Sequence, residues 1–183
     1  MRVIAGTAKG RRLATPKSHA IRPVLDQVKE SIFNILFNVE GLHILDLFAG
    51  TGAMGIEGLS RGGADAVFVD SSKEASRLIK KNLEMCGFAH CSKVLEMTAV
   101  KAVAILEKQG RPFDLIFVDP PYEQHFIKKT MEKLSRSNLL NENTIIVSEH
   151  HPKEPIPPIE GLILTDERKY GQTVVSFLCR QKK

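Results

Sequence analysis

The stretch His43-Ile-Leu-Asp-Leu-Phe48, followed at once by Ala49-Gly-Thr-Gly-Ala-Met-Gly55, decides the expected fold. The first half is an apolar run typical of a buried strand, and the second half places glycines where a chain must turn tightly. A helix is expected over residues 56–61, and Gly62 and Gly63 end it. A strand, a glycine loop and a helix in this order predict the first unit of a parallel α/β sheet.

The same alternation continues along the chain. Further strands are expected over residues 66–70, 93–97, 113–119 and 144–148, with a helix capped by Ser71 or Ser72 and others over residues 99–109 and 126–135. Beyond a proline-rich loop, residues 162–169 and 173–180 are expected to pair as an antiparallel hairpin at the sheet edge. We therefore predict an α/β fold with a mostly parallel sheet and helices on both faces.

The amino-terminal 40 residues follow a different pattern. Residues 2–13 predict a small hairpin, and residues 26–37 predict a helix whose apolar side carries Val28, Ile32, Ile35 and Leu36. We expect residues 1–40 to form an extension, and residues 41–183 to form one compact domain that carries the catalytic motifs.

Charge is concentrated in this extension. The net charge of the 183 residues is +5, and residues 1–31 alone account for it with seven basic and two acidic side chains. Such a segment favours a polyanionic partner, because Lys and Arg release counterions when they bind phosphates. A solvated arm without a specific partner is the alternative. The predicted contacts to such a polyanion are Arg2, Lys9, Arg11, Arg12, Arg22 and Lys29.

Composition places the chain among ordinary globular proteins. No apolar run is long enough to span a bilayer, and the amino terminus lacks the apolar core of a signal peptide, so we expect a cytoplasmic protein. Its three cysteines, at positions 86, 91 and 179, form no C-x-x-C pair. His150 and His151 are expected in a surface loop, and we predict no metal site.

The glycine loop predicts a nucleotide-type cofactor. Gly50-x-Gly52-x-x-Gly55 lets the backbone approach a ligand, and Asp70, 20 residues beyond Gly50, is placed to accept ribose hydroxyls. The same spacing also matches dinucleotide-binding enzymes. Asp46 favours S-adenosylmethionine instead, because a carboxylate beside the loop would repel a pyrophosphate but attract a cationic α-amino group.

Asp119-Pro-Pro-Tyr122 ends the fourth strand and suits the methylation of an exocyclic amine. The lone pair of such an amine is delocalised, so acceptors on its N–H groups would help it towards a tetrahedral nucleophile. The Asp119 carboxylate and the Pro120 carbonyl supply two acceptors, and Pro121 helps to make the segment rigid. Tyr122 offers a ring on which the extruded base can stack.

The residues from Asp46 to Gly52, together with those from Asp119 to Tyr122, are similar to the class I Rossmann-like amino-methyltransferases. Motifs along nearly the whole chain resemble the RsmD-type 16S ribosomal RNA guanine-N2 methyltransferases more specifically. These motifs are Arg2-Val-Ile-Ala-Gly6, Lys9-Gly-Arg11, Arg22-Pro23, Asp26-Gln-Val-Lys-Glu30, Phe33-Asn-Ile-Leu36, Tyr170-Gly-x-Thr173 and Ser176-Phe177.

The resemblance implies a seven-stranded sheet whose last strand is antiparallel. It implies S-adenosylmethionine as methyl donor and a guanine N2 in the small-subunit RNA as target, within an assembling or assembled particle. We further expect a monomer. The implied catalytic residues are Asp119, Pro120, Pro121 and Tyr122. The predicted cofactor residues are Asp46, Phe48, Gly50, Gly52, Asp70, Ser71, Thr98 and Ala99.

Two features depart from the family pattern. Where the family often has an acid for the adenine amino group, this chain has Thr98 with Ala99 beside it, or Glu96 if the register shifts. In the arm, the usual Thr-Arg-Pro-Thr is Ile21-Arg-Pro-Val24 here, which predicts altered RNA contacts.

Three other functions remain open from the sequence. An adenine-N6 DNA methyltransferase can share the Asp-Pro-Pro-Tyr motif, although this chain has little room for a separate DNA-reading region. A nicotinamide-dependent oxidoreductase would leave that motif unexplained. A non-enzymatic RNA-binding assembly factor could retain the fold alone.

Overall fold

The computed structural model describes residues 1–16, 26–121 and 126–181. Its helices are α1 (Asp26–Leu36), α2 (Ala53–Ser60), α3 (Lys73–Cys86), α4 (Ala99–Glu107) and α5 (Phe126–Ser135), with a short 3-10 turn, η1 (Ala89–Cys91). Its strands are β1 (His43–Leu47), β2 (Asp65–Asp70), β3 (Ser92–Glu96), β4 (Phe113–Val118), β5 (Leu140–His150), β6 (Leu162–Tyr170) and β7 (Thr173–Arg180).

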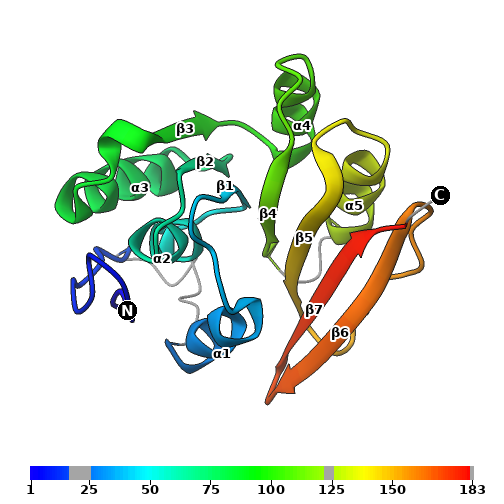
Figure 1. The fold of residues 1–183 in the computed structure, drawn as a ribbon, viewed down its shortest axis with the longest axis horizontal. Coiled ribbons are helices and arrows are strands. Elements are labelled where there is room, and N and C mark those ends of the chain that lie inside the picture. The colour runs from blue at the N-terminus through cyan, green and yellow to red at the C-terminus, as the bar shows by residue number, and fades with distance from the viewer. Residues whose placement is uncertain (17–25, 122–125, 182–183) are drawn as a thin grey trace.

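The seven strands form one sheet in the order β3-β2-β1-β4-β5-β7-β6. The first five run parallel, while β7 pairs antiparallel with both β5 and β6 (Figure 1). This confirms the predicted α/β fold with a carboxy-terminal hairpin. The strand order reverses between β1 and β4, and in open α/β sheets ligands bind beyond the carboxyl ends of the strands at such a point.

Two apolar clusters cover the two faces of the sheet. One joins α1, α2 and α3 to one face, and the other joins α4 and α5 to the opposite face. Neighbouring strand residues alternate between them, so that Ile44 belongs to the first cluster and Leu45 to the second. Because both faces are covered, the inner strands read as continuous apolar runs.

Residues 1–16 fold back on themselves and dock beside α2 (Figure 1). The Val3 amide donates to the Arg11 carbonyl at 2.9 Å, and the Gly10 amide donates to the Val3 carbonyl at 2.9 Å. The predicted hairpin is thus present, although as a single bridge between Arg2 and Arg12 rather than as regular strands. Its apolar side chains belong to the first cluster, with those of α1.

Two expectations about burial are wrong. Helix α1 buries Val28, Lys29, Ile32 and Phe33, whereas Ile35 is 38% exposed. His150 is buried rather than in a surface loop, because β5 continues to its pairing with β7 and the Ser176 hydroxyl lies 2.9 Å from His150 Nε2. Among the described residues, no helix is both long and apolar enough to cross a bilayer.

Candidate active site

The carboxyl ends of β1, β2 and β4 bring the predicted cofactor and catalytic segments to one edge of the sheet. Leu47 lies opposite Val69 on one side and Val118 on the other. The residues that follow these three are Phe48, Asp70 and Asp119, so they meet at the same level of the edge. The Ala49 amide then donates to the Val69 carbonyl at 2.9 Å and turns the loop over β2.

The loop after β1 has an unusual backbone. Gly50 and Gly52 have φ angles of 57° and 79°, which favour glycine. Phe48 has a φ of 63°, a conformation that bulky residues rarely adopt outside strained or functional segments. The centroid of its ring lies 6.0 Å from that of Phe126, so the loop contacts the start of α5.

Asp70 holds this loop in place. Its Oδ2 accepts the Gly50 amide at 2.9 Å, and its Oδ1 accepts the Ser72 amide at 2.8 Å. Each carboxylate oxygen retains a lone pair, so the group can still accept a ligand hydroxyl. Ser71 is exposed beside it, and Ser72 rather than Ser71 caps α3 by accepting the Ala75 amide at 3.3 Å.

Asp46 lies beneath the loop and is buried. Its Oδ2 accepts the Gly55 amide at 2.9 Å. Burial raises the pKa of Asp46 to about 7, and the nearby Asp70 charge adds to this, while the Gly55 hydrogen bond opposes it. A Cβ atom on residue 55 would lie 2.4 Å from Phe68 Cε1, so only glycine lets the start of α2 approach this closely.

The sequence analysis missed Glu57, a buried carboxylate that joins three segments. Its oxygens accept the Ile4 amide at 2.8 Å and the Ala5 amide at 3.0 Å, and the Arg61 Nε atom lies 2.8 Å away. Lys29 Nζ lies 3.4 Å from the same carboxylate. An acid within the otherwise apolar helix that follows the glycine loop was the available signal.

This arrangement contradicts the prediction that Lys29 binds RNA. Its side chain is fully buried, and its ammonium donates to the Arg2 carbonyl at 2.6 Å in addition to pairing with Glu57. Burial lowers the pKa of Lys29, although the Glu57 charge opposes that shift. Lys29 therefore fastens α1 to the amino-terminal segment instead of facing a phosphate.

Asn82 is a second buried polar residue that the sequence analysis missed. Its Oδ1 accepts the Ala14 amide at 2.7 Å, while its Nδ2 donates to the Ala14 carbonyl at 3.1 Å and the Thr51 carbonyl at 2.9 Å. One side chain of α3 thus links the amino-terminal segment to the glycine loop. An asparagine inside an amphipathic helix gives only a weak signal of such a role.

The other predicted site residues differ in their exposure and in their distance from this edge of the sheet. Thr98 is the exposed residue before α4 and Ala99 is buried, close to this edge because Asp70 lies opposite Glu96. The exposed basic residues of the amino-terminal segment are Arg2, Lys9, Arg11 and Arg12.

Two of the predicted site residues, Tyr122 and Arg22, lie outside the described residues. In the described ranges, no three His, Cys, Asp or Glu side chains are grouped to hold a metal ion.

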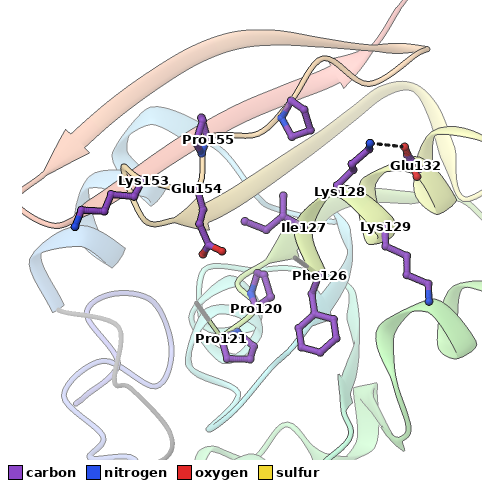
Figure 2. A pocket seen from close by; sticks show the side chains of 11 residues that line it. Pro120, Pro121, Phe126, Ile127, Lys128, Lys129, Glu132, Lys153, Glu154 and Pro155 are labelled. Atoms are coloured by element: carbon purple, nitrogen blue, oxygen red, sulfur yellow. Dashed lines mark ion pairs between the residues drawn. The ribbon is translucent and has the colours of Figure 1, made fainter. Parts of the chain in front are cut away.

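A groove of about 440 Å³ lies beside the catalytic turn. Pro120 and Pro121 form one wall, the start of α5 forms a second, and the proline-rich loop after β5 closes the third side (Figure 2). Pro120 is buried and Pro121 is exposed. Phe126 lines the groove and also contacts Phe48, which joins the groove to the glycine loop.

The sequence profile of the family described as "Conserved hypothetical protein 95" matches residues 1–179. The chain belongs to this family. It is the RsmD-type family that the motifs predicted, since the chain is 32% identical to "Ribosomal RNA small subunit methyltransferase D" of Escherichia coli K12 over 99% of this chain and 90% of that protein.

Two further relatives agree with this RsmD-type assignment. The chain is 38% identical to "Putative rRNA methyltransferase YlbH" of Bacillus subtilis over 97% of both chains. It superposes on the solved structure "Putative methyltransferase yhhF from Escherichia coli" with a TM-score of 0.88 and 30% identity, over 99% of this chain and 98% of that one.

Proposed function

We propose that this RsmD-type protein transfers a methyl group from S-adenosylmethionine to the N2 amino group of a guanine in 16S ribosomal RNA. The observation that carries the proposal is the register of β1 and β4, in which Leu47 lies opposite Val118. It brings the Asp119–Pro120 turn beside the glycine loop. The names of the relatives supply the substrate class, ribosomal RNA of the small subunit.

The residues around the glycine loop fit S-adenosylmethionine. When bound, this cofactor supplies a methyl group already activated on a sulfonium. Asp46 would hold the cationic amino group, and Asp70 would accept ribose hydroxyls while fixing Gly50. Gly52 would leave room for the methionine end, and Phe48 would pack against the cofactor. Ser71, Thr98 and Ala99 would line the side nearer the ribose and adenine.

The catalytic turn would prepare the amine. Asp119 and the Pro120 carbonyl would each accept one N–H, which localises the nitrogen lone pair and aims it at the methyl carbon. Pro121 would restrict the backbone, and Tyr122 would stack on the base. As the nitrogen–carbon bond forms and the carbon–sulfur bond breaks, Asp119 would take the released proton.

Residues 1–40 would act as the RNA-binding extension of a catalytic domain formed by residues 41–183. The exposed side chains of Arg2, Lys9, Arg11 and Arg12 support this role, and Arg22 remains a predicted contact. The substrate would be an assembling or assembled small subunit in the cytoplasm, and the protein would act as a monomer.

The test is transfer of labelled methyl groups to small ribosomal subunits that lack the modification, followed by mapping of the modified nucleotide. The wild-type protein should label one guanine at N2. Asp119→Asn should label it at least about 100-fold more slowly, because the amine loses an anionic acceptor, while S-adenosylhomocysteine binding stays intact.

Other outcomes would contradict the proposal. Label in duplex DNA instead of ribosomal RNA would favour an adenine-N6 methyltransferase. Binding of NADH but not S-adenosylhomocysteine would favour an oxidoreductase. Subunit binding without transfer by folded, cofactor-bound protein would leave an assembly factor.

A further inference from the structure

Glu154 presents a carboxylate in the groove beside Pro120 and Pro121. The residue is half-buried, and Figure 2 shows its carboxylate directed towards these two prolines. The other acidic residue along the described part of the groove is Glu132, and Figure 2 shows its carboxylate beside Lys128 on the same helix, at a distance of 3.9 Å. Of these two described carboxylates, that of Glu154 is the one that faces the catalytic turn (Figure 2).

Hydrogen bonds and prolines restrict the conformation of the loop around Glu154. The Glu154 amide donates to the His151 carbonyl at 2.9 Å, and the Lys153 amide donates to His151 Nδ1 at 3.1 Å. The loop also contains four prolines, which restrict its backbone: Pro152, Pro155, Pro157 and Pro158. Just before the loop, His150 is anchored against Ser176. Such a segment can hold a carboxylate in place before a ligand arrives.

A carboxylate at this place can distinguish guanine from other bases. Guanine carries an N1–H donor directly beside its 2-amino group, whereas adenine has an unprotonated acceptor nitrogen at N1. Enzymes that extrude a base read it through hydrogen bonds to this Watson–Crick edge. A carboxylate accepts an N–H strongly but repels a lone pair, and a buried mismatch of that kind is costly.

We propose that Glu154 is a specificity-determining residue that accepts the N1–H of the target guanine while Asp119 and the Pro120 carbonyl hold its 2-amino group. This inference rests on the proposed function, because Glu154 would bind the N1–H of the same guanine whose 2-amino group is methylated. The groove beside Pro120 and Pro121 then receives the Watson–Crick edge of the guanine.

The test replaces the mapped target by 2-aminopurine, which keeps the 2-amino group but has an unprotonated N1. Small subunits are reconstituted with a synthetic RNA segment carrying either base, and kcat/KM is measured on each. The wild-type protein should prefer guanine by roughly 10- to 100-fold, the usual effect of one charged hydrogen bond. In Glu154→Gln this preference should disappear, because the amide NH2 group can donate to an unprotonated N1.

Two other variants sharpen the test. Glu132→Gln makes the same chemical change in the groove and should keep the wild-type preference. Glu154→Ala should lower methylation of guanine and also lose the preference. Calorimetry with S-adenosylhomocysteine checks that each variant is folded.

A Glu154→Gln protein that retains the full preference for guanine would overturn the inference, even if its rates on both bases fall together. Failure of the wild-type protein to methylate guanine on unmodified subunits is a different result. It would contradict the proposed function itself, before any variant is compared.

Discussion

The carboxyl group of Asp46 lies where its negative charge has little solvent to stabilise it. Its pKa is raised from 3.8 to about 7 by burial first and by Asp70 second. In the free protein Asp46 is therefore neutral below pH 7, whereas in the unfolded chain it ionises above 3.8. Since the folded state binds the extra proton, this group lowers the free energy of unfolding as pH rises from about 4 to 7.

The same shift predicts a pH-dependent affinity for the cofactor. A cationic amino group prefers ionised Asp46, so binding below pH 7 must release a proton. The association constant for S-adenosylhomocysteine should be highest near pH 8, where Asp46 is ionised, and should fall by up to about tenfold per pH unit well below pH 7. Calorimetry across this range, in buffers of different ionisation enthalpy, measures both the affinity and the proton release.

Asp46→Asn provides the control for this prediction. Asparagine keeps an oxygen for the Gly55 amide but does not titrate. The variant should bind S-adenosylhomocysteine more weakly at pH 8, with an affinity that no longer changes with pH. A wild-type affinity that is constant from pH 6 to 8 would show that Asp46 does not hold the amino group.

Helix α2 is the element on which the cofactor loop and the amino-terminal segment meet. In its first turn, the Gly55 amide donates to the Asp46 carboxylate, and Glu57 lies in its middle. The carbonyl of its last residue, Ser60, accepts the Thr7 amide at 2.8 Å. The Ser60 hydroxyl also accepts the Ala8 amide at 2.9 Å. The amino-terminal segment is thus fastened by polar contacts along the length of this helix as well as by its apolar residues.

This docking predicts that replacing Gly6 or Gly10 of the segment by alanine lowers the free energy of unfolding by different amounts. Gly6 has a φ of 78°, and a Cβ atom there would lie 1.6 Å from the Ser60 carbonyl oxygen. Gly10 has a φ of 82°, and apart from its two chain neighbours no residue has an atom within 4 Å of its Cβ position. Gly10→Ala should therefore lower the free energy of unfolding only through backbone strain, by about 1 to 2 kcal/mol. Gly6→Ala should cost about 3 kcal/mol or more, because the segment must also move off α2.

Urea unfolding of the two variants measures this difference, and proteolysis near Arg11 and Arg12 reports whether the segment has detached. The two substitutions introduce the same methyl group into the same backbone conformation, so only the contact with Ser60 differs. Equal destabilisation would mean that the segment does not depend on its close approach to the helix.

The sequence was sufficient for features that depend on local pattern. Alternating apolar runs and glycine turns located the strands, and placed Asp46, Asp70 and Asp119 near one edge. It was not sufficient for features that depend on distant partners. Lys29 can be buried because Glu57 and the Arg2 carbonyl compensate its charge. His150 can be buried because its Nε2 atom forms a hydrogen bond with the Ser176 hydroxyl. No local pattern contains those contacts.

In the whole molecule, the amino-terminal segment and the main sheet share one core. Val3, Ala8 and Leu13 belong to the same apolar cluster as Phe117 of β4 and Phe177 of β7. The exposed basic residues are therefore carried on a surface that is rigidly connected to the proposed active site. Such a surface can orient an RNA backbone with respect to the catalytic turn, whereas a freely moving arm would only raise the local concentration of RNA.

The salt dependence of RNA binding can separate exposed basic residues that contact phosphates from Lys29, which is buried. Each lysine or arginine that contacts a phosphate contributes roughly 0.7 to 0.9 to the slope of log K against log salt. The double variant Arg11→Ala with Arg12→Ala should therefore reduce the slope for 16S ribosomal RNA by about 1.5. Lys29→Met removes the same type of charge from a buried position, so it should destabilise the protein but leave the slope unchanged. A reduced slope for Lys29→Met, or an unchanged slope for the double variant, would contradict RNA binding by this surface.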